Sequence, residues 1–198
     1  MKKDLLYRLF SRIPSLETER LTLRAMRVSD AEDMYVYAHR EDVTRYLTWY
    51  AHESIDETRQ YLTYVGQRYR TGDFYDWAVI HRADGRMIGT CGFTSFCCPS
   101  DVGEIGYVLN PDYHGRGLAT EAVRAVLRFG FEELSLHRIE ARFIEGNDPS
   151  RHLMERVGMT FEGFARESER IKGRFCTIGT CAILRREFQA SPRAQIRS

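Results

Sequence analysis

Residues 102–122 read VGEIGYVLNPDYHGRGLATEA, and the interpretation of the whole chain starts from this stretch. Its first part, from Val102 to Leu109, is rich in β-branched and aromatic side chains and is stopped by Asn110-Pro111, which is typical of a strand. From Ala119 to Phe131, apolar side chains recur at helical spacing. The stretch therefore predicts a strand, a turn that contains glycines, and an amphipathic helix.

The turn from His114 to Thr120 has the composition of an anion site. Its two glycines let the backbone approach a ligand and adopt left-handed dihedral angles. Successive N–H groups at the positive end of a helix suit a pyrophosphate. Two other phosphate motifs fit less well, because the chain has no Lys-Ser or Lys-Thr pair for a P-loop, and Thr120 stands where a dinucleotide fingerprint needs glycine. A tight turn without a ligand is the alternative interpretation.

On either side of this unit, alternating and helical patterns predict a single mixed α/β (α+β) domain. We expect a mostly antiparallel central sheet of about seven strands with about four helices. The domain spans residues 16–188, between an N-terminal extension at 1–15 and a flexible C-terminal tail at 189–198. The strands are expected at 20–26, 73–81, 87–96, 102–109, 138–144, 161–171 and 175–184, and the helices at 29–39, 54–72, 119–131 and 149–157.

Composition limits the partners of this domain. Of the 198 residues, 43% are hydrophobic and 29% are charged, and the net charge is +1. A nearly neutral chain lacks the field that holds DNA, and no apolar run approaches the ~20 residues that span a bilayer. Five cysteines without a CxxC spacing and six histidines without an HxxH spacing indicate reduced thiols and no metal site. We therefore expect a cytoplasmic protein that binds neither a membrane nor DNA.

The blocks from Glu104 to Leu109 and from His114 to Ala122 resemble the signature of GCN5-related N-acetyltransferases (GNAT), including their Q/R-x-x-G-x-G/A turn. Segments 19–24, 44–49 and 147–150 resemble, more narrowly, the RimJ/RimL branch, which acetylates the N-termini of ribosomal proteins. The resemblance covers the whole predicted domain. It implies a GNAT-like fold, acetyl-CoA as co-substrate, and direct transfer of acetyl to a primary amine in a ternary complex.

The resemblance also implies which residues hold the acetyl donor. The backbone of the strand is expected to bind the pantetheine arm and to polarise the thioester carbonyl, and Asn147 is expected to hold the pantetheine amide. His114 stands where the family usually has Gln or Arg. The residues expected to bind acetyl-CoA are Tyr107, Val108, Leu109, His114, Gly115, Arg116, Gly117, Leu118, Ala119, Thr120 and Asn147.

Three side chains are candidates for the chemistry. Glu104 shares a strand face with Gly106 and Val108, from which it can reach the amine as a base. Glu169 matches a carboxylate that some ribosomal-protein acetyltransferases use as the base. Ser150 is the hydroxyl near the expected sulfur, in a short helix that lacks the tyrosine of many family members. The structural alternatives are surface charge for the two glutamates and helix capping for Ser150.

The acceptor is the part of the function that the sequence determines least. Trp49 and Tyr50 are expected to form a wall of the acceptor pocket, with core packing as the alternative. A protein or peptide N-terminus, such as that of a ribosomal protein, is the leading acceptor, since an α-amine has a pKa of about 7.7–8.0 and needs little help from a base. The other hypotheses are a small-amine acetyltransferase, acting on a polyamine, amino acid or antibiotic, and a non-catalytic sensor of acyl-CoA. We expect a monomer or a homodimer.

Overall fold

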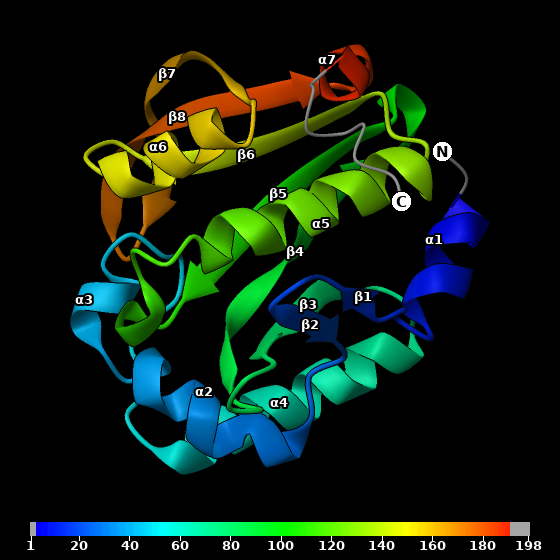
Figure 1. Ribbon diagram of the computed structural model, residues 1–198. Helices are drawn as coiled ribbons and strands as arrows, with labels where there is room; N and C mark the ends of the chain where they lie inside the picture. The colour runs from blue at the N-terminus through cyan, green and yellow to red at the C-terminus, as the bar shows by residue number, and fades with distance from the viewer. Residues whose placement is uncertain (1–2, 191–198) are drawn as a thin grey trace.

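The computed structural model describes residues 3–190, and residues 191–198 of the expected tail lie outside the described part (Figure 1). The strands are β1 Leu16–Glu17, β2 Leu21–Arg24, β3 Tyr75–His81, β4 Met87–Cys97, β5 Val102–Leu109, β6 Arg138–Ile144, β7 Thr160–Ile171 and β8 Arg174–Leu184. The α-helices are α1 Lys3–Phe10, α2 Ala31–Ala38, α3 Glu41–Thr44, α4 Ile55–Arg70, α5 Leu118–Glu132, α6 Asp148–Arg156 and α7 Arg185–Ala190. Short 3-10 helices are η1 Val28–Asp30, η2 Cys98–Ser100 and η3 Pro111–Tyr113.

The expected mixed, mostly antiparallel sheet is confirmed. The strands of this eight-stranded sheet follow the order β1-β2-β3-β4-β5-β6-β8-β7, and each neighbouring pair is antiparallel except β5 with β6. The described residues hold one strand and three helices more than expected. Three of the four, β1, α3 and α7, have two, four and six residues, too few to show a clear period in the sequence.

The fourth additional element is α1, and it makes residues 3–15 part of the core rather than a separate extension. Leu6 and Phe10 are buried in the same hydrophobic cluster as Trp77. The indole Nε1 of Trp77 donates a hydrogen bond to the carbonyl oxygen of Pro14, 2.6 Å away. Basic residues near the N-terminus suggest a solvated end, but two apolar side chains four residues apart share one face of a helix and can pack together.

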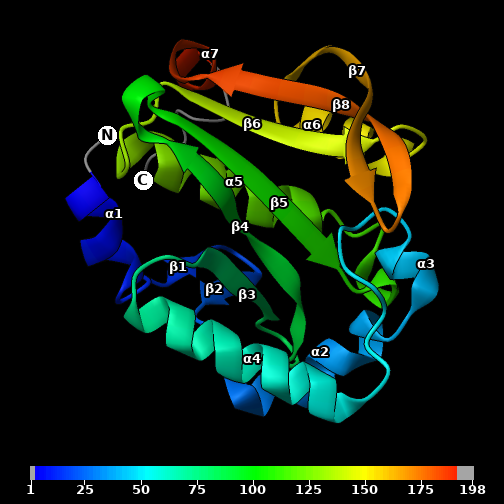
Figure 2. The ribbon, with the colours of Figure 1, turned by 180° about the vertical axis from the view of Figure 1, so that it is seen from behind.

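Helices cover the two faces of the sheet unequally. In Figures 1 and 2, α5 and α6 lie on one face, whereas α2 and α4 lie on the other, against the half of the sheet that holds β2 to β4. Side-chain alternation on β3 sends Trp77 and Val79 into the core beneath α5, and Ala78 and Ile80 into the core beneath α4. Figure 2 shows β6, β8 and β7 from the face that no described helix covers. None of the described helices is long and apolar enough to cross a membrane.

The parallel pair β5 and β6 separates halfway along its length. Val102 to Ile105 pair with Arg138 to Ala141, and the pairing ends there. Beyond that point β5 stays paired with β4 as far as Leu109, while β6 stays paired with β8 as far as Ile144. The main chain of β5 from Gly106 to Leu109 therefore has an edge that is not paired to β6, directly before the glycine turn.

Candidate active site

The glycine turn gives α5 an N-terminus without a side-chain cap. Gly115 and Gly117 have φ angles of 72° and 77°, in the left-handed region that favours glycine. Gly117 is the N-cap residue, and no side chain accepts a hydrogen bond from the first turn of α5. The first N–H groups of a helix have no intrahelical partner. The turn therefore presents main-chain donors at the positive end of a 15-residue helix.

A set of contacts between the start of β2 and α5 holds this turn in place. Glu121 Oε1 accepts hydrogen bonds from Thr18 Oγ1 (2.6 Å) and from the main-chain nitrogen of Arg20 (2.8 Å). Arg20 Nε donates to Glu121 Oε2 (2.7 Å), and Arg20 Nη1 donates to the carbonyl oxygen of Arg116 (2.8 Å). Sequence reasoning found the segment that contains Arg20 but gave the residue no role.

The side chains of the turn fold back onto the protein. His114 Nε2 donates to the carbonyl oxygen of Leu109, 3.0 Å away at the end of β5. Arg116 Nη2 donates to the carbonyl oxygen of Asp112 (3.0 Å), and its guanidinium lies over the ring of Tyr113. Leu118 and Thr120 are buried and Ala119 is half-buried. The part of the turn from His114 to Gly117 is thus exposed, and the side chains of Leu118 and Thr120 are turned into the protein.

Tyr107 and Ser150 meet on the α6 side of the sheet. Tyr107 Oη lies 2.8 Å from Ser150 Oγ and 3.1 Å from the carbonyl oxygen of Ser150. Burial raises the pKa of Tyr107 above its ordinary value, although the hydrogen bond with Ser150 opposes the shift. The hydroxyl therefore stays protonated at neutral pH. From the sequence, only the backbone of Tyr107 was expected to bind acetyl-CoA. Strand alternation places its side chain on the face that α5 and α6 cover, opposite to the face of Glu104.

Asn147 is the N-cap residue of α6, but its side chain makes no capping hydrogen bond. Its carbonyl oxygen accepts from the main-chain nitrogens of Ser150 and Arg151, both at 3.2 Å. The helix is thus held through the backbone of Asn147. The amide of this half-buried side chain is available to a ligand.

Both carboxylates expected to act as the base contact one arginine. Arg142 Nε lies 3.1 Å from Glu104 Oε2, and Arg142 Nη1 donates to Glu169 Oε1. Arg142 lies on β6 just beyond the separation from β5. Its pKa is affected most by burial, which lowers it, but the two glutamates outweigh this effect and the net pKa is raised. The three side chains together carry one negative charge.

Lys172 connects two segments that are far apart in the sequence. Lys172 Nζ donates to the carbonyl oxygen of Thr44 (2.7 Å) and lies 5.2 Å from the centre of the Tyr50 ring. Burial and the nearby Arg174 lower the pKa of Lys172. This contact joins the β7–β8 turn to the loop that follows α3, and Figure 2 shows these two segments side by side at one end of the sheet.

The two aromatic residues expected to line an acceptor pocket have different surroundings. Tyr50 is 69% exposed. Trp49 is half-buried, packs against the core under α4, and has its ring centre 5.4 Å from that of His52. Core packing therefore explains part of the burial of Trp49, whereas most of the Tyr50 side chain is exposed to solvent.

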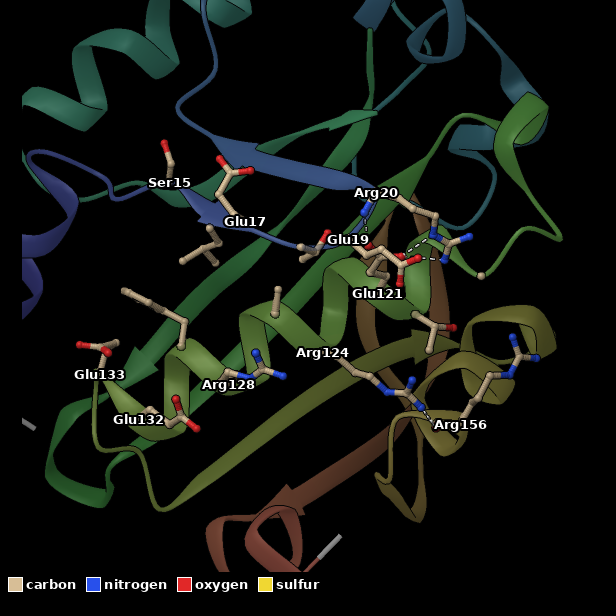
Figure 3. A pocket seen from close by; sticks show the side chains of 16 residues that line it. Ser15, Glu17, Glu19, Arg20, Glu121, Arg124, Arg128, Glu132, Glu133 and Arg156 are labelled. Carbon is tan, nitrogen blue, oxygen red and sulfur yellow. Dashed lines mark hydrogen bonds and ion pairs between the residues drawn. The ribbon is translucent and has the colours of Figure 1, made fainter. Parts of the chain in front are cut away.

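A groove of about 760 Å³ begins at the glycine turn and follows the outer side of α5 (Figure 3). Gly117 and Thr120 line it at one end. Its charged lining residues are four arginines and five glutamates: Arg20, Arg124, Arg128 and Arg156, and Glu17, Glu19, Glu121, Glu132 and Glu133. The residues that line the groove do not include Glu104, Ser150 or Glu169. The groove therefore lies on the outer side of the turn, apart from these three residues. Within the described part of the chain, no three His, Cys, Asp or Glu side chains gather where they could hold a metal ion.

The sheet separation, the glycine turn and the uncapped helix together define an acyltransferase of the GNAT type. A family model described as "Acetyltransferase (GNAT) domain" matches residues 20–160, and the chain belongs to this family of N-acetyltransferases. The relative "Uncharacterized N-acetyltransferase p20" of Bacillus licheniformis is 33% identical over 174 residues, which is 88% of this chain and 98% of the relative.

Two further proteins show the range of similar chains. A crystal structure of a GNAT-family acetyltransferase from Bacillus anthracis superimposes with a TM-score of 0.78 and 29% identity, over 88% of this chain and 100% of that one. A spermidine N(1)-acetyltransferase of Vibrio cholerae is 24% identical over 168 residues, which is 85% of this chain and 95% of the relative. The family is thus established, and the acceptor is not.

Proposed function

We propose that this N-acetyltransferase transfers the acetyl group of acetyl-CoA to the α-amine of a protein N-terminus, as in the RimJ/RimL branch that segments of its sequence resemble. The observation that carries this proposal is the charge at the acceptor end. Glu104 and Glu169 are already paired with Arg142, and Lys172 adds a positive charge at the edge. These four side chains sum to no net charge, so they offer little to a polycation such as spermidine.

The donor fits the turn and the unpaired edge of β5. The pyrophosphate would sit on the uncapped N–H groups after Gly117, where a Cβ added to Gly117 would have only an Arg20 side-chain nitrogen, at 3.6 Å, within contact range. The pantetheine arm would lie along the main chain of Gly106 to Leu109, with the amide of Asn147 as a hydrogen-bonding partner. The arginines of the outer groove would meet the phosphate at the nucleotide end.

The chemistry requires an amine without its extra proton, a donor for the oxyanion, and a stabilised leaving group. Main-chain N–H groups on the unpaired edge of β5 can serve the oxyanion. Ser150 and Tyr107 serve the thiolate, because their hydroxyl groups are hydrogen-bonded to each other beside the expected sulfur. An ordinary thiol has a pKa of about 8.5, so a tyrosine with a raised pKa stabilises the thiolate by a hydrogen bond rather than by giving up its proton.

The role of base stays proposed for Glu104 or Glu169. An α-amine with a pKa of about 7.7–8.0 is partly deprotonated at neutral pH, so it needs only modest help. However, the ammonium group must compete with Arg142 for either carboxylate. Glu104 is the less exposed of the two, with 17% of its side chain accessible against 33% for Glu169.

The test is a thiol-release assay in which the protein and acetyl-CoA are offered three kinds of amine. These are short peptides with a free N-terminus, spermidine, and an aminoglycoside. We expect kcat/KM to be highest for peptides, and mass spectrometry to place the acetyl group on the α-nitrogen. A higher kcat/KM for spermidine would contradict the proposed acceptor while leaving the acetyltransferase activity intact. Peptides blocked at the N-terminus but containing lysine are the matched control.

A further inference from the structure

Asp76 lies in a row with two glycines across three strands. It is paired with Gly92 on β4, and Gly92 is paired with Gly106 on β5. Residues directly opposite each other in antiparallel strands point to the same face, so the Asp76 side chain shares the α4 face with two residues that have no side chain. Gly106 is the first residue of β5 beyond the pairing with β6.

The carboxylate of Asp76 leans across Gly92 towards β5. One of its oxygens lies 2.7 Å from the position that a Cβ on Gly92 would occupy. Adjacent strands are about 4.8 Å apart, so only one strand spacing separates Gly92 from Gly106. A Cβ added to Gly106 would meet only the methyl group of Thr94 within contact range. That methyl group lies 2.9 Å from the added Cβ, too close for an ordinary contact, but Thr94 is an exposed side chain. A rotation of Thr94 would therefore make room above Gly106 for a small group such as an amine.

The surroundings of Asp76 are polar and include an unused donor. Its oxygen Oδ1 accepts from the main-chain nitrogen of Trp77 (3.0 Å), and the Thr90 hydroxyl also binds it. Among residues 3–190 it has no ion-pair partner, unlike Glu104 and Glu169. Tyr37, on α2, is fully buried, and its Oη finds no hydrogen-bond partner within the described chain.

The row of Asp76, Gly92 and Gly106 lies largely inside the protein but keeps some access to solvent. Asp76 and Gly106 are half-buried rather than buried, and so are Tyr61 on α4 and Trp49 in the loop after α3. The rings of Trp49, His52 and Tyr61 follow one another, with centres 5.4 and 6.1 Å apart. This aromatic wall leads from the predicted acceptor entrance towards the α4 face.

Burial raises the pKa of Asp76 to about 7. The hydrogen bonds from Thr90 and Trp77 lower the pKa but do not cancel the effect of burial. The groups that face it stay neutral at that pH. Burial raises the pKa of Tyr37 on α2 and of Tyr61 and Tyr69 on α4.

Other titratable groups near this face already have partners. Glu104, on the same strand face as Gly106, is paired with Arg142. Burial lowers the pKa of His52, which is hydrogen-bonded to Thr58 Oγ1 (2.8 Å). Arg24 is paired with Asp30 at 2.7 Å. Asp76 is therefore a carboxylate that changes charge near neutral pH without a neighbouring cation to hold it ionised.

We propose that Asp76 is the carboxylate that receives the acceptor amine, binding its ammonium group above Gly106 and taking a proton from it before attack. The inference rests on the proposed amine acetyltransferase activity and names its base. It differs from the choice of Glu104 or Glu169, because an ammonium at Asp76 does not have to displace Arg142.

The step balances as follows. The ammonium R–NH₃⁺ gives one proton to the Asp76 carboxylate, and the neutral amine then attacks the thioester carbonyl and forms the C–N bond. The C–S bond breaks as the tetrahedral intermediate collapses, and the nitrogen loses a second proton, which ends on the thiol of free coenzyme A. Asp76 returns its proton to water. The net products are the amide, the thiol and one released proton.

The closing experiment compares Asp76→Asn with wild type, with Glu104→Gln as the competing base and Asp56→Asn as the control. Asparagine keeps Oδ1 for the Trp77 N–H, and the Asp56 side chain is exposed and pairs only with Arg59. The acceptor is whichever amine of the panel wild type turns over fastest. We expect Asp76→Asn to lose about 100-fold in kcat/KM at pH 6.5, in the range typical of a general base, while calorimetric affinity for acetyl-CoA is unchanged.

The pH dependence separates a base from a structural carboxylate. In wild type, kcat/KM should rise with a midpoint near 7, whereas in Asp76→Asn it should follow the pKa of the amine itself, about 7.7–8.0 for an α-amine, so that the loss shrinks as pH rises. Retained activity in Asp76→Asn, or a large loss confined to Glu104→Gln, would overturn the inference. Preference for spermidine would refute the proposed acceptor without touching Asp76, and no turnover with any amine would refute both.

Discussion

Tyr107 on β5 and Ser150 on α6 are joined by a hydrogen bond of 2.8 Å between their hydroxyl oxygens. The short helix α6 lacks the tyrosine that many members of the family have there, and this contact places the hydroxyl of a tyrosine from β5 beside Ser150. The pair has a fixed geometry, because Tyr107 Oη also lies 3.1 Å from the Ser150 carbonyl oxygen. Ser150 therefore acts together with Tyr107 in the proposed mechanism.

Removing the Tyr107 hydroxyl should slow the reaction without weakening donor binding. We expect Tyr107→Phe to lower kcat by about 10- to 100-fold, somewhat less than the loss of a direct oxyanion donor, because Ser150 would remain beside the expected position of the sulfur. Ser150→Ala should lower kcat at least as much, and the double variant should lose less than the product of the two. Tyr64→Phe is the control, since its exposed hydroxyl contacts Arg68 on the same helix. Fully multiplicative losses would show that the two hydroxyls act independently.

Arg142 should govern the preference between acceptors. Arg142→Ala leaves Glu104 and Glu169 without their shared cation, so the site would gain a net negative charge. We expect KM for spermidine to fall several-fold and to become more sensitive to salt, because the new attraction is electrostatic. Steady-state kinetics at two salt concentrations measure this, with Arg59→Ala, on the outer side of α4, as the control. An unchanged KM for spermidine would mean that these carboxylates do not face the acceptor.

Two glycines with similar geometry separate donor binding from stability. Gly117 and Gly85 have φ angles of 77° and 71°. A Cβ on Gly85 would meet nothing, and one on Gly117 would meet only Arg20 at 3.6 Å. Alanine at either position should cost about 1–2 kcal/mol, because left-handed backbone is unfavourable for L-residues. Only Gly117→Ala should also weaken the affinity for acetyl-CoA, measured by calorimetry. Equal affinities in the two variants would show that the pyrophosphate does not bind at this turn.

Asp76 should make stability depend on pH in an unusual direction for a carboxylate. Its pKa is about 7 in the folded protein against a reference value of 3.8, so the folded state binds more protons between these values. The free energy of unfolding contributed by this group is highest below pH 4 and falls as pH rises to about 7. Urea titrations should therefore show Asp76→Asn gaining stability relative to wild type at pH 8 but not at pH 4. A constant difference across this range would mean that Asp76 has an ordinary pKa.

Much of the fold could be predicted from sequence periodicity. The strands at 102–109 and 138–144 have the observed bounds, because each is a clear alternating run with a turn or proline at its end. The packing of α1 was not predictable in the same way. Its pair Leu6 and Phe10 has a helical spacing, but the decision between a solvated helix and a core helix depends on the surface formed by Trp77 and its neighbours.

The candidate site was predictable where it depends on consecutive residues, as in the glycine turn. It was not predictable where it depends on register between strands. The row of Asp76, Gly92 and Gly106 exists only because two antiparallel pairings align these residues. Similarly, nothing in the sequence shows that Glu104 and Glu169, which lie 65 positions apart in number, share Arg142.

The pairing of β5 with β6 ends at Ile105, and this should affect the hydrogen exchange of the sheet in solution. Main-chain amides between Gly106 and Leu109 that would point across this seam have no strand to protect them, so they should exchange with deuterium faster than those of the neighbouring β4. A bound pantetheine chain would fill the seam like a missing strand. Bound coenzyme A would thus complete the sheet between β5 and β6, and its release after each turnover would leave this edge of β5 unprotected again.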